Sequence, residues 1–158
     1  MATALQIYLQ DHLAGATFGL ELVERSRRNN EGTELGDRLQ ELAVEIRADR
    51  EALEAVMSAA GADRSHLKTS AAWALEKVGR LKPNGRVRGY TALGRLLELE
   101  ALVVGITGKR ALWRGLQDSL AQVPSLQAFD FAALAERAEN QLGRVEQLRL
   151  DAARAVIG

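Results

Sequence analysis

Proline interrupts this chain only twice, at Pro83 and Pro124, and both prolines stand between long stretches rich in Ala, Leu, Glu and Arg. Those four residue types favour helix, whereas proline breaks the interior of one. Apolar residues recur every three or four positions in these stretches, and no stretch shows the alternation of a strand. The sequence therefore predicts an all-helical chain.

Four long helices are expected from the capping and helix-breaking residues that separate these stretches. The first runs over about 3–28 and stops at "RRNNEG". The second begins after Thr33, a suitable N-cap, and ends near Gly61. The third covers about 91–122, and after "VPSLQAFD" Asp130 can cap a fourth helix that reaches the end of the sequence.

A long link, 62–89, joins the two helical hairpins and is expected to hold a short helix at about 66–81. Hairpins of this length can bury their apolar stripes only against each other. We therefore predict a single domain, 1–158, folded as an all-α four-helix bundle of two long hairpins. The sequence leaves open whether the link crosses over the bundle or the helices run up-down-up-down.

Composition narrows the classes of function. Lys and Arg together number 21, as do Asp and Glu, so no net charge attracts nucleic acid or an anionic membrane. The absence of cysteine excludes disulfides, thiolate catalysis and cysteine-ligated metals. No apolar run reaches the roughly 18 residues of a membrane span, and the N-terminal residues lack the pattern of a signal peptide. We expect a cytoplasmic protein.

Each predicted helix places one ionisable side chain at the centre of an apolar stripe: His12, Asp49, Glu100 and Arg149. At about 100° per residue, Glu100 projects among apolar neighbours while Glu98 projects to the opposite side. The neighbours of Glu100 are Leu93, Leu96, Leu97, Val103 and Val104. Counted in residues from the predicted hairpin turns, His12 and Asp49 lie at similar heights along the bundle axis, and so do Glu100 and Arg149.

Two helical hairpins, a long link and inward polar side chains resemble the ferritin-like superfamily. That resemblance implies a diiron centre, built from a glutamate on each of two helices and Glu-x-x-His on each of the other two. Glu100 would match one ligand glutamate. The second helix reads "EIRADRE" and the fourth "ENQLGRVEQLR", and neither contains Glu-x-x-His; the other histidine, His66, lies in the link. We therefore expect the ferritin-like outline with no metal site and no cofactor.

The charge of Arg149 also argues against a metal centre, because a permanently protonated guanidinium repels a divalent cation. We favour a buried ion-pair network in which Arg149 bridges Asp49 or Glu100 and so ties helices together. Three alternatives stay open: a pocket where Arg149 and His12 hold a small anion, a mononuclear metal site, and catalysis.

The link carries a cluster of basic residues with a single acid, Glu76, among them. The cluster comprises Lys77, Arg80, Lys82, Arg86 and Arg88. Such a cluster can bind nucleic-acid phosphates, but Tyr90 is the only aromatic residue nearby, so a stacking platform is missing. We interpret the cluster as a solvated loop and expect only weak, non-specific retention of nucleic acid.

Two helices carry a second apolar line, on the side away from the predicted core. In the third helix this line is Leu99, Leu102, Ile106 and Trp113, and in the first it is Ile7, Ala14, Phe18 and Leu22. The short helix in the link can cover only one of them. We expect the other, around Ile7, Phe18 and Leu22, to meet its own copy in a homodimer.

These features favour a non-enzymatic binding or interaction module that acts through helix faces. The alternatives are a degenerate ferritin-like protein that binds a metal or small anion at the bundle centre, and nucleic-acid association through the basic link.

Overall fold

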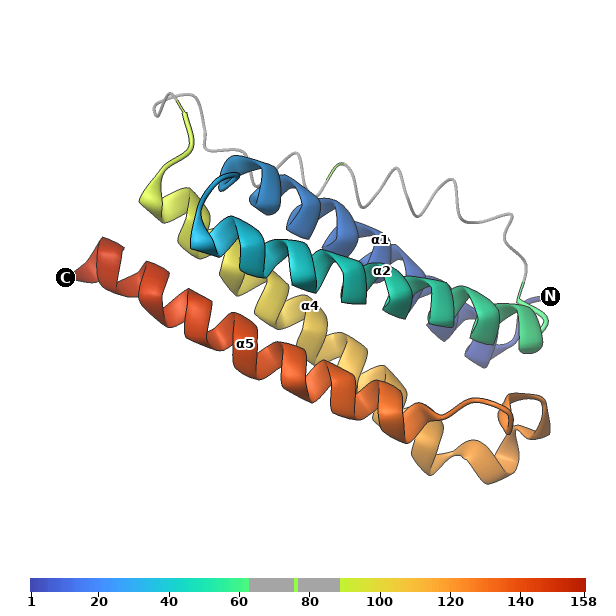
Figure 1. Ribbon diagram of the computed structural model, residues 1–158. Coiled ribbons are helices and arrows are strands. Elements are labelled where there is room, and N and C mark those ends of the chain that lie inside the picture. Colours follow the sequence, from blue (N-terminus) through green and yellow to red (C-terminus); the bar gives the residue numbers. More distant parts are fainter. Residues whose placement is uncertain (63–75, 77–88) are drawn as a thin grey trace.

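The computed structural model describes residues 1–62, 76 and 89–158, and the chain folds into an all-α four-helix bundle, as predicted. Its long helices are α1 (Ala4–Asn29), α2 (Glu34–Ala59), α4 (Ala92–Asp118) and α5 (Phe131–Ile157) (Figure 1). Two 3-10 turns, Leu120–Gln122 and Pro124–Leu126, join α4 to α5. The expected short helix at 66–81 and the basic cluster of the link lie outside the described residues.

Local sequence sets the helix ends. The predicted caps Thr33 and Asp130 accept hydrogen bonds from the backbone N–H groups of Gly36 (3.1 Å) and Ala133 (2.9 Å). Thr3 and Thr91 cap α1 and α4 in the same way. Just after α2, Gly61 adopts a φ of 66°, a left-handed conformation that glycine reaches without steric cost. The third helix was expected to reach position 122, but it ends earlier, at Asp118, where 3-10 turns take over.

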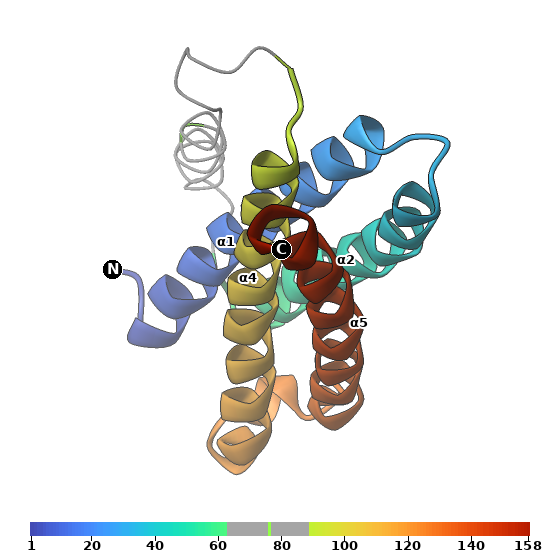
Figure 2. The ribbon, with the colours of Figure 1, turned by 90° about the vertical axis from the view of Figure 1, so that its left-hand side faces the viewer.

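The order of the helices in space settles the topology of the bundle. The α1–α2 hairpin lies above the α4–α5 hairpin in Figure 1, and α2 and α4 run in the same direction. The end of α2 and the start of α4 stand at opposite ends of the bundle (Figure 1). Because α2 and α4 are parallel, an up-down-up-down arrangement is excluded. Figure 2, which looks roughly along the helices, shows α1 and α4 close together.

The core of α2 is the predicted one, but α4 buries the side that the sequence assigned to the outside. Leu99, Leu102, Ile106 and Trp113 are all buried, whereas Leu93, Leu97 and Val104 are exposed. Because α4 is apolar nearly all round, its pattern cannot choose between the two lines. Tertiary packing decides which line is buried, as where the Trp113 ring stacks on Phe131 of α5 with the ring centroids 6.0 Å apart.

The first helix buries parts of both its lines, because it packs against α2 on one side and α4 on another. Leu9 and Leu13 come from the predicted stripe, but Leu22 is also completely buried within the chain. Leu22 therefore cannot form a dimer interface, and that assignment was wrong. Phe18 packs against the core, while Ile7 is 50% exposed. No helix in the described ranges is long and apolar enough to cross a bilayer.

The α1–α2 turn depends on a glycine, which gives the first testable prediction. A Cβ built on Gly36 would lie 2.2 Å from the carbonyl oxygen of Asn30. We expect Gly36→Ala to destabilise the protein by about 1–3 kcal/mol, because backbone must shift to admit the methyl group. The measurement is urea unfolding followed by circular dichroism.

The matched control is Gly115→Ala on α4, where an added Cβ meets no described atom within 4 Å. Alanine there should stabilise the helix by about 0.5–1 kcal/mol. If Gly36→Ala stabilised the protein equally, the close approach of the turn would be refuted.

Candidate binding site at the bundle centre

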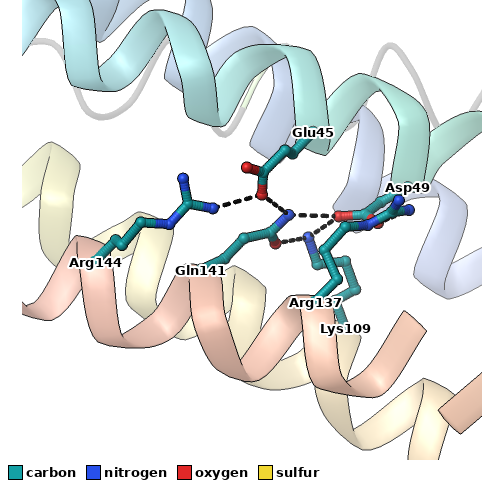
Figure 3. Close-up of polar contacts among 6 residues, drawn as sticks. All are labelled: Glu45, Asp49, Lys109, Arg137, Gln141 and Arg144. Carbon is teal, nitrogen blue, oxygen red and sulfur yellow. Dashed lines mark hydrogen bonds and ion pairs between the residues drawn. The ribbon is translucent and has the colours of Figure 1, made fainter. Parts of the chain in front are cut away.

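Asp49 is the buried ion at the centre of the bundle. It is 3% exposed, and its carboxylate accepts hydrogen bonds from Lys109 of α4 and from Arg137 and Gln141 of α5 (Figure 3). Arg137 Nε lies 2.7 Å from Oδ1, and Gln141 Nε2 lies 3.0 Å from Oδ2. Lys109 Nζ also donates to Oδ2. One carboxylate thus connects α2 to both helices of the other hairpin.

Gln141 extends this cluster to a second acid. Its amide group is fully buried and donates to Glu45 Oε2 (3.0 Å) as well as to Asp49, while its carbonyl oxygen accepts from Lys109. Arg144 Nη2 donates to Glu45 from the other side (Figure 3). The central network therefore comprises Glu45, Asp49, Lys109, Arg137, Gln141 and Arg144. Two carboxylates face three cations, which leaves one net positive charge.

The central network occupies the seam between α2 and α5. Those helices pack against each other far less than the helices within each hairpin do, and α1 and α4 supply most of the contact between hairpins. Long polar side chains bridge the seam instead of apolar ones. Because a buried ion pair offsets its desolvation only with good geometry, the network fixes how the hairpins are placed more than it adds stability.

Of the four predicted polar residues, only Asp49 belongs to the central network. Glu100 stands with its side chain 46% exposed, in the outward row of α4, and it pairs with Arg149 at 3.8 Å. Arg149 makes its shorter contact, 2.6 Å, with Glu146 on its own helix. The assignment of Glu100 and Arg149 to the bundle centre was therefore wrong, and it failed because α4 buries its other line.

The cation at the centre is Lys109, which lies on the same side of α4 as Glu98, opposite the stripe predicted around Glu100. Lys109 lies on the same face of α4 as Leu102 and Ile106. Helical spacing would therefore have placed it at the bundle centre if that face had been taken as the core. Glu98 was missed for the same reason. It is 5% exposed and accepts hydrogen bonds from Arg25 (3.0 Å) and the Tyr90 hydroxyl (3.0 Å).

A groove between α1, α2 and α4 opens beside the central network. Its volume is about 410 Å³, and both Asp49 and Lys109 reach its wall. Trp113 also lines it, is 1% exposed, and its indole N–H has no acceptor among the described residues. Such a buried donor costs free energy until something accepts its hydrogen bond. We call this the α1–α4 groove.

His12 lies in the same groove as Asp49, as its predicted height implied, although no hydrogen bond joins the two in the described contacts. The imidazole meets the Tyr8 ring edge-on, with centroids 4.6 Å apart. Burial lowers the pKa of His12 below 6.5, against the opposing charge of Asp11. The pKa of Lys109 is also lowered by burial, although the charge of Asp49 opposes the shift. The lowered pKa of His12 favours its neutral form.

The residues at the centre do not fit a diiron site. Both oxygens of Asp49 already accept hydrogen bonds from cations, and Lys109 brings a positive charge where a metal would stand. In the described part of the chain, no three His, Cys, Asp or Glu side chains gather as a metal would require. The charge that opposes a metal belongs to Lys109 and Arg137 rather than to Arg149.

Comparison with known proteins adds no family to this description. A scan against protein-family models, a search of curated proteins and a search of solved structures each found no match.

The central network yields a prediction about stability. Asp49→Asn removes the carboxylate that faces Lys109 and Arg137 and should destabilise the protein by about 3–5 kcal/mol, because buried charge is left without a partner. The double change Asp49→Leu with Lys109→Met should recover much of that loss. Urea unfolding of the variants measures both effects.

Glu139→Gln is the matched control, because Glu139 also pairs with two cations, Arg110 and Arg114, but is exposed. It should change stability by less than about 1 kcal/mol. Equal losses at Asp49 and Glu139 would show that burial of the network contributes nothing.

Proposed function

We propose that this protein is a non-enzymatic binding module that holds a small, largely apolar molecule in the α1–α4 groove. The ligand's polar end, a carboxylate or carbonyl oxygen, would face Lys109 and Trp113. This proposal keeps the alternative of a small anionic ligand near His12 and Asp49, and replaces Arg149 with Lys109 as the cation.

The observation that carries the proposal is a set of glycines inside two helices. Gly15 and Gly19 of α1 and Gly105 and Gly108 of α4 all line the groove. A Cβ built at any of the four meets no described atom within 4 Å. Each glycine costs about 1 kcal/mol relative to alanine in a helix. Glycines between helices are ordinarily explained by close packing, but here they border open space, so what they provide is room for a ligand.

The polar end of the groove supports the choice of ligand. The Lys109 ammonium has three N–H donors and uses two on Asp49 and Gln141, which leaves one for an acceptor. The Trp113 indole N–H adds a second donor without an acceptor. Most other lining residues are apolar or glycine. A mostly apolar pocket with a few convergent donors is the usual form of a small-molecule site.

The test fills the groove from a glycine. Gly105→Phe should weaken binding of the dye anilinonaphthalene sulfonate, which has an apolar ring body and one acidic group, by at least about tenfold. The measurement is a fluorescence titration. Thermal unfolding of the variant should show equal or higher stability, because a helical glycine has been removed.

Gly115→Phe is the control on the same helix, since Gly115 is exposed and lies outside the groove. Its dye affinity should stay within about twofold of the parent. Dye binding that is equal in all three proteins, or absent in the parent, would contradict the proposal.

The ferritin-like outline supports a second, broader part of the proposal. Two antiparallel hairpins in which α2 and α4 run in the same direction, as in Figure 1, are compatible with the arrangement that the ferritin-like resemblance implies. We propose that the chain uses this architecture with a salt-bridge network and a ligand groove where a ferritin-like protein has iron.

The homodimer also stays a proposal, but we now place its interface on α4 instead of α1. Leu93 (53% exposed), Leu97 (45%) and Val104 (72%) share one outward face of α4. An aligned row of exposed apolar side chains is less common on a monomer than scattered ones. We propose that this row meets its copy across a two-fold axis.

Leu97→Glu should convert the dimer to a monomer, because it places a carboxylate on the two-fold contact and lies outside the α1–α4 groove. Light scattering at tens of micromolar protein measures the change. Val44→Glu on α2 is the control, since Val44 is at least as exposed (60%) and lies apart from the row. A parent that is monomeric, or a Leu97→Glu variant that stays dimeric, would remove α4 as the interface.

A further inference from the structure

A second groove runs along the seam between α2 and α5, and one residue of α4, Arg95, also lines it. Its volume is about 530 Å³, and it shares no lining residue with the α1–α4 groove. Its walls are largely apolar, and two guanidinium groups reach into them, Arg95 from α4 and Arg144 from α5. The apolar lining consists of Leu35, Leu42, Leu148, Ala152 and Ala155. We call this the seam groove.

Arg95 differs from the other partly buried arginines in the described part of the chain. Every one of the others forms an ion pair with a carboxylate: Arg25, Arg27, Arg50, Arg110, Arg137, Arg144 and Arg149. Among the described residues Arg95 has no such partner, and its Nε is buried without an acceptor there. Its guanidinium lies over the Tyr90 ring, 5.6 Å from the centroid. That stacking holds the group in place but leaves its charge unneutralised.

Arg144 adds a second guanidinium to the same groove, and not all of its N–H groups have an acceptor. One of its terminal nitrogens donates to Glu45 in the central network, while its Nε is buried without an acceptor. Two positioned cations thus border an apolar hollow, and each has an N–H without a partner. The fork of an arginine suits carboxylate and phosphate oxygens, and hydrogen bonds between charged groups are the stronger ones.

The acids of the seam groove stand at its outer edge and limit what can enter. Glu34 and Asp151 are well exposed and pair with Arg38 and Arg154. Glu41 is exposed as well. A long polyanion such as nucleic acid would lie against this acidic rim, whereas a small anion reaches the arginines beyond it.

We propose that the seam groove is a second binding site, which takes an amphipathic monoanion: one carboxylate or phosphate group on an apolar chain. The anionic group contacts Arg95 and Arg144, and the chain lies on the leucines and alanines of the wall. This site is independent of the ligand proposed for the α1–α4 groove.

The experiment is isothermal titration calorimetry of the whole protein with octanoate and octyl phosphate, and with octanol as the uncharged probe. We expect at least one of the anions to bind and octanol to bind at least about tenfold more weakly. Arg95→Gln should weaken the anion by about tenfold or more. Arg38→Gln is the matched control, because Arg38 also lines the groove but is exposed and paired with Glu34, and its effect should stay within about threefold.

A second variant keeps the test decisive if Arg95→Gln unfolds. Ala155→Phe changes no charge and fills the exposed end of the groove, so it should remove the same component of octanoate and octyl phosphate binding that Arg95→Gln removes, while leaving any binding in the α1–α4 groove unchanged. Gly105→Phe should show the reverse pattern. The two proposals therefore fail separately.

Phosphatidylglycerol vesicles distinguish the two sources of such an anion. Cosedimentation with vesicles that is lost in Arg95→Gln would assign the site to a membrane lipid, whereas binding confined to octanoate or octyl phosphate would assign it to a free acid or ester. The proposal is overturned if the parent binds neither free anions nor vesicles. It is also overturned if binding survives both Arg95→Gln and Ala155→Phe.

Discussion

The carboxylate of Asp49 is the contact on which the arrangement of the two hairpins depends. It is nearly inaccessible to solvent and connects α2 to Lys109 on α4 and to Arg137 and Gln141 on α5. Apolar packing holds each hairpin together and joins α1 to α4, but apolar contacts can slide with little cost. A buried carboxylate cannot slide, because any other register would leave it without donors. The polar seam therefore selects one placement of the hairpins among several that would bury similar apolar area.

The same seam explains why the bundle has grooves on two sides. Because α2 and α5 meet through long polar side chains, they stand too far apart to interdigitate apolar ones, and the seam groove lies between them. On another side, the glycines of α1 and α4 have no side chains to fill the space beside Lys109. Both features lower stability relative to a fully packed bundle. Buried donors without acceptors, on Trp113 in one groove and on Arg95 and Arg144 in the other, lie beside these openings.

The position of the lysine also separates this bundle from the ferritin-like proteins that it resembles in outline. A carboxylate-rich centre attracts a divalent cation, and here Lys109 and Arg137 already neutralise the central carboxylate. Burial lowers the pKa of Lys109, and the contact with Asp49 opposes that shift. The same side chain thus completes the ion pair and reaches the wall of the α1–α4 groove. The central network and the proposed binding site therefore share one ammonium group.

The sequence by itself determined the helices, their caps and the bundle, because Thr33, Asp130 and Gly61 act on neighbouring backbone and the apolar period is local. It also placed Asp49 correctly, since α2 has only one apolar stripe. Tertiary structure alone decided which side of α4 is buried, since Leu93, Leu97 and Val104 form as apolar a line as Leu102, Ile106 and Trp113. That choice moved Glu100 and Arg149 outward and brought Lys109 inward. The partners of Asp49 come from helices 60 and 88 positions away in sequence, and the parallel placement of α2 and α4, which no local pattern encodes, brings them together.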